Sequence, residues 1–100
     1  MTFYTRKQLV EMLETDEGFL LALEREEIIE SDAPSGAAGE FSERMLERAR
    51  VAHNLVADLD VNLPGAAIIV RLREEVTELR HRMTEVLAEL ERRGDVRTSS

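Results

Sequence analysis

Apolar residues recur with helical spacing near the start of the chain. Leu9, Val10 and Leu13 fall on one side of a helix that repeats about every 3.6 residues. Thr5 is followed three residues later by Gln8, which fits a capping box, where a hydroxyl and an amide satisfy exposed backbone donors. Together these signals predict a first helix from about Thr5 to Glu14.

A second apolar stripe follows at once. Asp16 is suited to cap a helix through FLLALEREEII, residues 19–29, whose recurring apolar positions are Phe19, Leu20, Leu23 and Ile28. The next segment, SDAPSGAAGE, is rich in Gly, Pro, Ser and Ala and cannot continue a helix. It predicts a loop or a weak β-hairpin between residues 30 and 41.

A third stripe begins after Ser42, which can cap the helix. Its apolar positions are separated by steps of four, three, four and three: Met45, Ala49, Ala52, Val56 and Leu59. The stretch DLDVNLPG, residues 58–65, then ends this helix and begins another. Asn62 can cap the new helix, Pro64 suits its first turn, and Val61 can pack on Ala66 as a hydrophobic staple.

The last third of the chain carries a heptad repeat. Steps of three and four separate Ile69, Leu72, Val76, Leu79, Met83, Val86 and Leu90. Gly94 and a polar tail end the pattern, so the predicted helix has about 29 residues and a length of about 43 Å. Its six Glu and six Arg side chains balance, as on the solvated flank of a coiled coil.

This long helix predicts a homodimer. Three short helices cannot cover so long a stripe, whereas a second copy of the same helix can. The alternative is an amphipathic helix folded back on its own domain. We expect a domain at residues 1–61, a dimerisation helix at 62–94 and a polar tail at 95–100.

Composition narrows the class of protein. The chain has 100 residues, 43% of them hydrophobic but only four aromatic, which describes one small domain with a modest core. Cysteine is absent, so disulfides and thiolate metal sites are excluded. The N-terminus lacks the apolar run of a secretory signal, and no apolar stretch approaches the ~18 residues of a membrane span. We therefore expect a cytoplasmic protein.

The net charge of −8 is concentrated in one segment. Between Glu14 and Asp32, eight acids face Arg25 alone, a local balance of −7, whereas 13 acids and 12 bases nearly cancel elsewhere. Such a segment repels phosphate backbones and attracts basic protein surfaces, although acidic runs also occur as merely solvated faces.

The order of these elements resembles the MerR-type winged helix-turn-helix proteins, and within them the CbpM family of chaperone modulators. The residues that carry the likeness are YTRKQLVEML (4–13), ALEREEII (22–29), FSERMLERAR (41–50) and DVNLPGAAIIVRLREEVTELRHRM (60–83). The likeness covers about 80 residues in the right order, and each motif alone is weak. It implies a mainly α fold: a winged helix-turn-helix with a degenerate wing, followed by a C-terminal coiled-coil helix.

The resemblance to CbpM implies binding to the J-domain of a CbpA/DnaJ-type co-chaperone and inhibition of its stimulation of Hsp70. J-domains carry a strongly basic helix, for which we expect an acidic contact surface made of Glu24, Glu26, Glu27 and Glu30.

HspR-like MerR-type repressors share similar motifs, so a DNA-binding repressor is the alternative. Relatives that bind DNA place Arg, Tyr and Tyr where this chain has Leu21, Ala22 and Leu23, and Arg where it has Gly39 and Glu40. Loss of these phosphate-contacting groups beside a cluster of carboxylates makes duplex binding unfavourable.

No residue pattern indicates catalysis. His53 and His81 lie on different predicted helices without a ligand pair at metal spacing. Asp58 and Asp60 flank a helix end, where acids are common. We therefore predict no catalytic residue, no metal and no cofactor.

Overall fold

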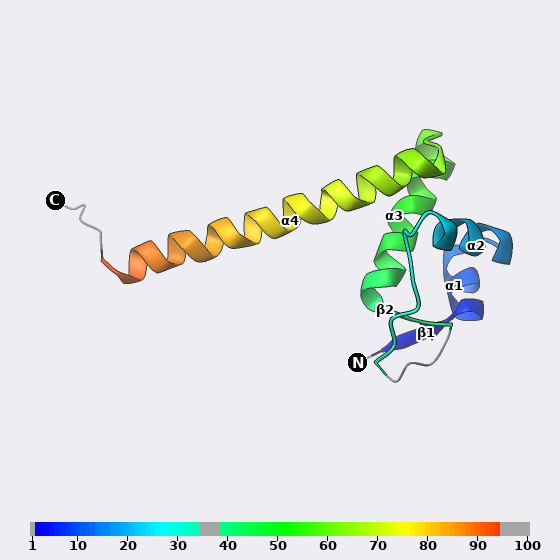
Figure 1. The fold of residues 1–100 in the computed structure, drawn as a ribbon, viewed down its shortest axis with the longest axis horizontal. Coiled ribbons are helices and arrows are strands. Elements are labelled where there is room, and N and C mark those ends of the chain that lie inside the picture. Colours follow the sequence, from blue (N-terminus) through cyan, green and yellow to red (C-terminus); the bar gives the residue numbers. More distant parts are fainter. Residues whose placement is uncertain (1, 35–38, 95–100) are drawn as a thin grey trace. The chain divides into compact units, whose positions relative to one another are not determined.

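The computed structural model describes residues 2–34 and 39–94. These residues form two short strands and four helices: β1 (Phe3–Thr5), α1 (Arg6–Leu13), α2 (Glu17–Arg25), β2 (Glu40–Ser42), α3 (Glu43–Leu59) and α4 (Leu63–Arg92). Figure 1 shows their order along the chain. Contacts divide the chain into two compact units, Met1–Val70 and Arg71–Ser100.

The helices begin at the capping residues that the sequence predicts. Thr5 and Gln8 form both bonds of the capping box: the Gln8 amide donates to Thr5 Oγ1 at 3.1 Å and the Thr5 amide to Gln8 Oε1 at 2.8 Å. Asp16, Ser42 and Asn62 accept backbone amides from the first turns of α2, α3 and α4 in the same way.

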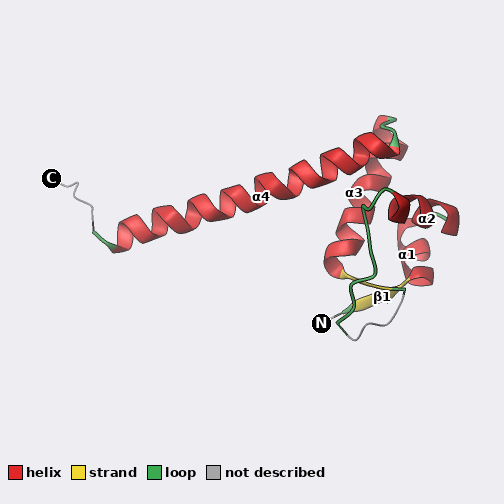
Figure 2. Cartoon of the chain, viewed as in Figure 1, coloured by secondary structure: helices red, strands yellow, loops and turns green. Residues whose placement is uncertain are grey.

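The small sheet differs from the predicted hairpin. β2 pairs antiparallel with β1 at the N-terminus, with Tyr4 opposite Phe41, and each strand leads directly into a helix (Figure 2). A loop or a weak hairpin was expected within residues 30–41. One backbone bond there joins the Asp32 amide to the Glu40 carbonyl at 3.1 Å, whereas the strand at residues 40–42 pairs with β1. Residues 35–38 of that segment, like the predicted tail at 95–100, lie outside the described residues.

The core gathers apolar side chains from every element of the N-terminal unit. Phe41, Leu9, Leu20 and Leu23 are completely buried, and Met45 lies beside them on α3. The beginning of α4 adds Ala66, Ala67 and Val70, so the compact unit extends nine residues beyond the expected boundary at residue 61. Leu59, expected on the buried stripe of α3, is 67% exposed.

The long helix is present from Leu63 to Arg92. Its heptad residues are 38–63% exposed within the chain. Among the described residues, no helix combines the length and apolar character needed to cross a membrane.

Candidate functional site

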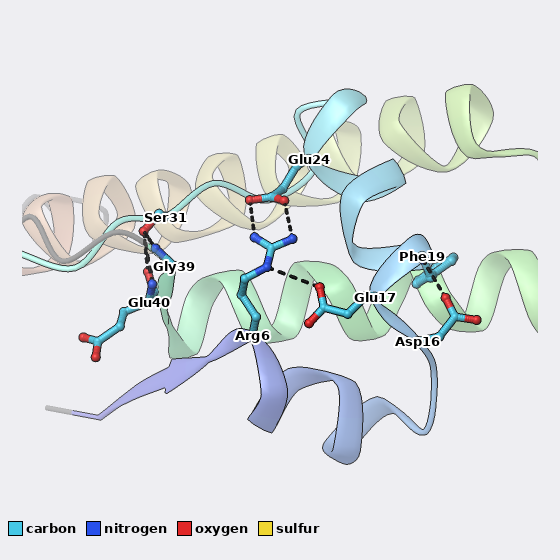
Figure 3. Close-up of polar contacts among 8 residues, drawn as sticks. All are labelled: Arg6, Asp16, Glu17, Phe19, Glu24, Ser31, Gly39 and Glu40. Atoms are coloured by element: carbon cyan, nitrogen blue, oxygen red, sulfur yellow. Dashed lines mark hydrogen bonds and ion pairs between the residues drawn. The ribbon is translucent and has the colours of Figure 1, made fainter.

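Two carboxylates of the acidic segment, those of Glu17 and Glu24, have structural roles. The side chain of Arg6, in the first turn of α1, extends toward Glu17 and Glu24 of α2 (Figure 3). Its guanidinium meets Glu24 through Nη1 to Oε2 at 2.9 Å and Nη2 to Oε1 at 2.8 Å, and Glu17 through Nε to Oε1 at 3.4 Å. The hydrogen bond to Glu24 raises the pKa of Arg6 above its ordinary value, and partial desolvation opposes the shift. Glu24 therefore holds α1 to α2.

Asp32 joins the end of the acidic segment to α3. Its carboxylate accepts the Ser42 amide at 2.8 Å and the Ser42 hydroxyl at 2.6 Å, while Ser42 caps α3. Asp16 is likewise engaged, since it caps α2 by accepting the Phe19 amide at 2.8 Å (Figure 3). Half of the eight acids between residues 14 and 32 thus have intramolecular partners.

The other acids of the predicted surface follow α2. Glu26 and Glu27 lie in a tight turn, and Glu30 lies in the loop directly after it. Glu26 is half-buried, and Glu27 and Glu30 are exposed. Within residues 2–34 and 39–94, no side-chain hydrogen bond or ion pair engages these three carboxylates. We call Glu26, Glu27 and Glu30 the acidic turn.

The backbone of the acidic turn corrects the predicted length of the second helix. The helix ends at Arg25, and Glu27 adopts a left-handed conformation with φ of 60°. The Glu27 amide donates to the Glu24 carbonyl at 3.0 Å and the Ile28 amide to the Leu23 carbonyl at 2.9 Å, the two bonds of a Schellman motif.

Burial of two isoleucines explains the early end of α2. A continued helix would rotate Ile28 about 140° away from Leu23, toward solvent. The turn instead buries Ile28 and Ile29, each 1% exposed. This angular mismatch between Leu23 and Ile28 can be read from the sequence and indicates that the helix ends before Ile28. The more common signal, a glycine just after the helix, is missing here.

The acidic turn is anchored to the core by an uncommon hydrogen bond. The Glu30 amide donates to the sulfur of buried Met45 at 3.4 Å. Met45 therefore packs as the sequence predicts and also orients the backbone of the acidic turn.

The base of the degenerate wing is held by Ser31. Its hydroxyl accepts the amides of Gly39 and Glu40 at 2.9 and 3.2 Å and donates to the Glu40 carbonyl at 3.0 Å (Figure 3). Gly39 has φ of 82°, which favours glycine, and an added Cβ would lie 3.8 Å from the Arg6 side chain. The turn that leads into β2 thus lies beside Arg6.

The two histidines have local contacts. The rings of Phe19 and His53 meet edge to face, with centroids 5.4 Å apart. His81 lies 3.1 Å from Glu85 one turn along α4. In the part of the chain that the structure describes, no group of three or more His, Cys, Asp or Glu side chains could hold a metal ion.

Comparison with known proteins identifies the family. The profile described as MerR HTH family regulatory protein matches residues 4–90. The chain belongs to the MerR helix-turn-helix family. The predicted resemblance to MerR-type proteins is confirmed. The predicted mainly α fold, with its small two-stranded wing and long C-terminal helix, is also confirmed.

The curated relatives are chaperone modulators. The chaperone modulatory protein CbpM of Coxiella burnetii, in strains Dugway 5J108-111, RSA 331 / Henzerling II and CbuG_Q212, is 32% identical to this MerR-family chain over 56 residues. The alignment covers 56% of this chain and 53% of each relative, so it spans about half the length of the relatives. No solved structure gives a significant match.

The positions compared with DNA-binding MerR proteins differ in exposure. Leu21 is 46% exposed, whereas Leu23 is completely buried and belongs to the core. Ala22, Gly39 and Glu40 are half-buried. At position 21, where the resemblance implies an arginine in DNA-binding MerR proteins, this chain presents an exposed leucine.

Proposed function

We propose that this chain is a chaperone modulator. It binds the J-domain of a CbpA/DnaJ-type co-chaperone and inhibits the stimulation of an Hsp70 chaperone. The main support is the acidic turn, which presents three carboxylates without intramolecular partners among the described residues. The likeness to CbpM over about half the length of each protein supports the same proposal.

The acidic turn is locally unfavourable, which favours a role in binding. Glu26 and Glu27 place negative charge beside the carbonyl end of α2, where the helix dipole disfavours anions, although Arg25 offsets part of this effect. Glu27 also occupies a left-handed position at which glycine would avoid strain. Residues that break such local rules often serve function.

Glu24 has an indirect part in this proposal. Because its carboxylate pairs with Arg6, it fixes the position of α2 instead of offering a free charge. The partner's basic helix then contacts Glu26, Glu27 and Glu30.

The test is binding of immobilised J-domain at two salt concentrations. Reversing Glu26 and Glu27 to lysine should slow association and flatten its salt dependence, because complementary charge mainly raises association rates. Both lysines retain a Cβ, so the backbone strain at position 27 is unchanged. Circular dichroism of the variant checks its fold.

A matched control changes net charge equally. The double variant Glu11→Lys and Glu14→Lys alters two exposed acids of α1 and the following turn, and Glu14 shares the left-handed conformation with φ of 56°. It should associate as wild type does. Unchanged association of the folded Glu26 and Glu27 variant would contradict binding at the acidic turn and would favour a site on α3 around Arg44, Glu47 and Arg48. A wild-type chain that does not bind J-domains would refute the co-chaperone function.

Inhibition is measured separately from binding. Adding the wild-type chain should lower J-domain-stimulated ATP hydrolysis by Hsp70, and the charge-reversed variant should do so less effectively at equal concentration. Binding without inhibition would leave the chain as a J-domain ligand but not an inhibitor.

The second candidate is a DNA-binding repressor, which the match to a family of regulatory proteins favours. The exposed leucine and the adjoining acidic turn disfavour it, because phosphate contacts supply most non-specific affinity for DNA.

We also propose that the chain forms a homodimer through α4. The seven heptad residues form an exposed apolar stripe that the helix of a second copy could cover.

A further inference from the structure

The exposed surface of α2 has an apolar centre. Leu21 is 46% exposed, whereas its neighbours Leu20 and Leu23 are completely buried. Packing in the core therefore does not explain why position 21 carries a leucine. The other exposed residues of the helix are Glu17, Gly18 and Arg25.

Gly18 lies about one turn before Leu21 on α2. Gly18 has no side chain, and an added Cβ would press on the Asp16 carboxylate at 3.3 Å. Because that carboxylate caps the helix, a side chain at position 18 would disturb the cap, which explains the glycine. The missing side chain also leaves room for another helix to approach Leu21.

Acids border the apolar centre at both ends of the helix. Asp16 is exposed before α2, and Glu27 is exposed after it. Arg25 is the one basic residue between positions 14 and 32. An apolar centre with a charged rim is the usual anatomy of a protein interface, and the sign of this rim selects a basic partner.

The position of α2 in the fold supports the same conclusion. It is the second helix of the helix-turn-helix, which in DNA-binding proteins of this fold enters the major groove. Here the macromolecule would meet leucine and acids, a combination that suits a protein and repels a phosphate backbone.

From these observations we infer that the exposed surface of α2 is a docking site for an amphipathic basic helix, in which an aliphatic or aromatic side chain of the partner packs on Leu21 while Lys or Arg side chains face the acids. This inference rests on the proposed function and deepens it. The acidic turn speeds association, whereas Leu21 prolongs the life of the complex.

The experiment compares two truncations of similarly exposed side chains in the full chain. Leu21→Ala removes the apolar centre, and Met12→Ala is the matched control, because Met12 is 44% exposed but lies on α1. Immobilised J-domain is the probe, and association and dissociation rates are measured separately.

We expect Leu21→Ala to dissociate about tenfold faster, with an association rate within about twofold of wild type. Met12→Ala should match wild type in both rates. Alanine favours helix and neither side chain is buried, so both variants should fold, as thermal unfolding can verify.

The outcomes separate the two proposals. If wild type binds and Leu21→Ala dissociates at the same rate, the docking site is overturned while the proposed function stands. Equal losses in both alanine variants would also overturn it, because the apolar contact would then not be specific to α2. A wild-type chain that does not bind would refute the proposed function and, with it, this docking site.

Discussion

Arg6 holds the carboxylate of Glu24 through two contacts, at 2.9 and 2.8 Å, and thereby joins the first turn of α1 to the end of α2. Both side chains are less than one-third exposed. The bidentate geometry fixes the direction in which α2 presents its exposed residues.

Breaking this ion pair should cost stability in a non-additive manner. Arg6→Gln and Glu24→Gln should each lower the free energy of unfolding by about 1 kcal/mol, because each leaves a partly desolvated charge without its partner. The double variant should lose less than the sum. Urea unfolding of all four proteins provides the measurement, and strictly additive losses would show that the two residues do not interact.

Replacing Glu27 should separate stability from binding. Glu27→Gly should raise the free energy of unfolding by about 0.5–1 kcal/mol, because glycine relieves the strain of the left-handed position. The same variant should bind the J-domain more weakly, since it removes a carboxylate of the acidic turn.

Two controls identify the cause of that gain. Glu27→Ala removes the charge but keeps a Cβ, so the difference between the alanine and glycine variants measures backbone strain. Glu14→Gly, at φ of 56°, should also gain stability but keep its affinity for the J-domain. A loss of stability in Glu27→Gly would contradict the strain argument.

Tyr4 should ionise at a higher pH than an ordinary tyrosine. Its hydroxyl donates to Glu43 Oε2 at 2.9 Å, and this bond raises the pKa of Tyr4. Because the folded-state pKa is raised, the associated stability is complete below the unfolded-state pKa of about 10 and is lost as pH rises through the folded-state pKa.

The chain has one tyrosine, so phenolate absorbance reports this group alone. The titration midpoint of the folded protein should lie above that of the urea-unfolded chain. Glu43→Gln should move the midpoint toward the ordinary value, because the acceptor then carries no charge. Equal midpoints in the folded wild type and this variant would rule out the effect of Glu43.

The α4 stripe should mediate dimerisation. Leu79→Asp should dissociate the dimer, because burying two unpaired carboxylates in an apolar seam is costly. Ala88→Asp is the control: position 88 is exposed and lies about two and a half turns further along, on the opposite face of α4. Sedimentation at tens of micromolar provides the measurement, and a monomeric wild type would contradict the proposed homodimer.

The chain should bind duplex DNA only weakly. With leucine at the exposed position 21 and acids in the following turn, we expect only a salt-sensitive background in a gel-shift assay. Sequence-specific binding with a sub-micromolar Kd at about 150 mM salt, where screening is strong, would support the repressor instead.

The sequence by itself determined the features that depend on neighbours along the chain. Thr5, Asp16, Ser42 and Asn62 were predictable caps, because each side chain bonds an amide three residues later. The long helix was predictable from its heptads for the same reason, since its periodicity is local. The proposed acidic surface was named from charge density alone, which locates carboxylates along the chain but not their partners.

Only the tertiary structure decided which distant residues meet. The pairing of β1 with β2 joins residues more than 30 positions apart, and nothing in either tripeptide specifies the other. The same holds for Arg6 and Glu24, whose ion pair depends on how α1 packs on α2. The end of α2 followed from the core, because burial of Ile28 and Ile29 required the chain to turn at Glu27 despite the strain. Local chemistry thus set where helices begin, whereas non-local packing set where α2 ends and which acids remain available to a partner.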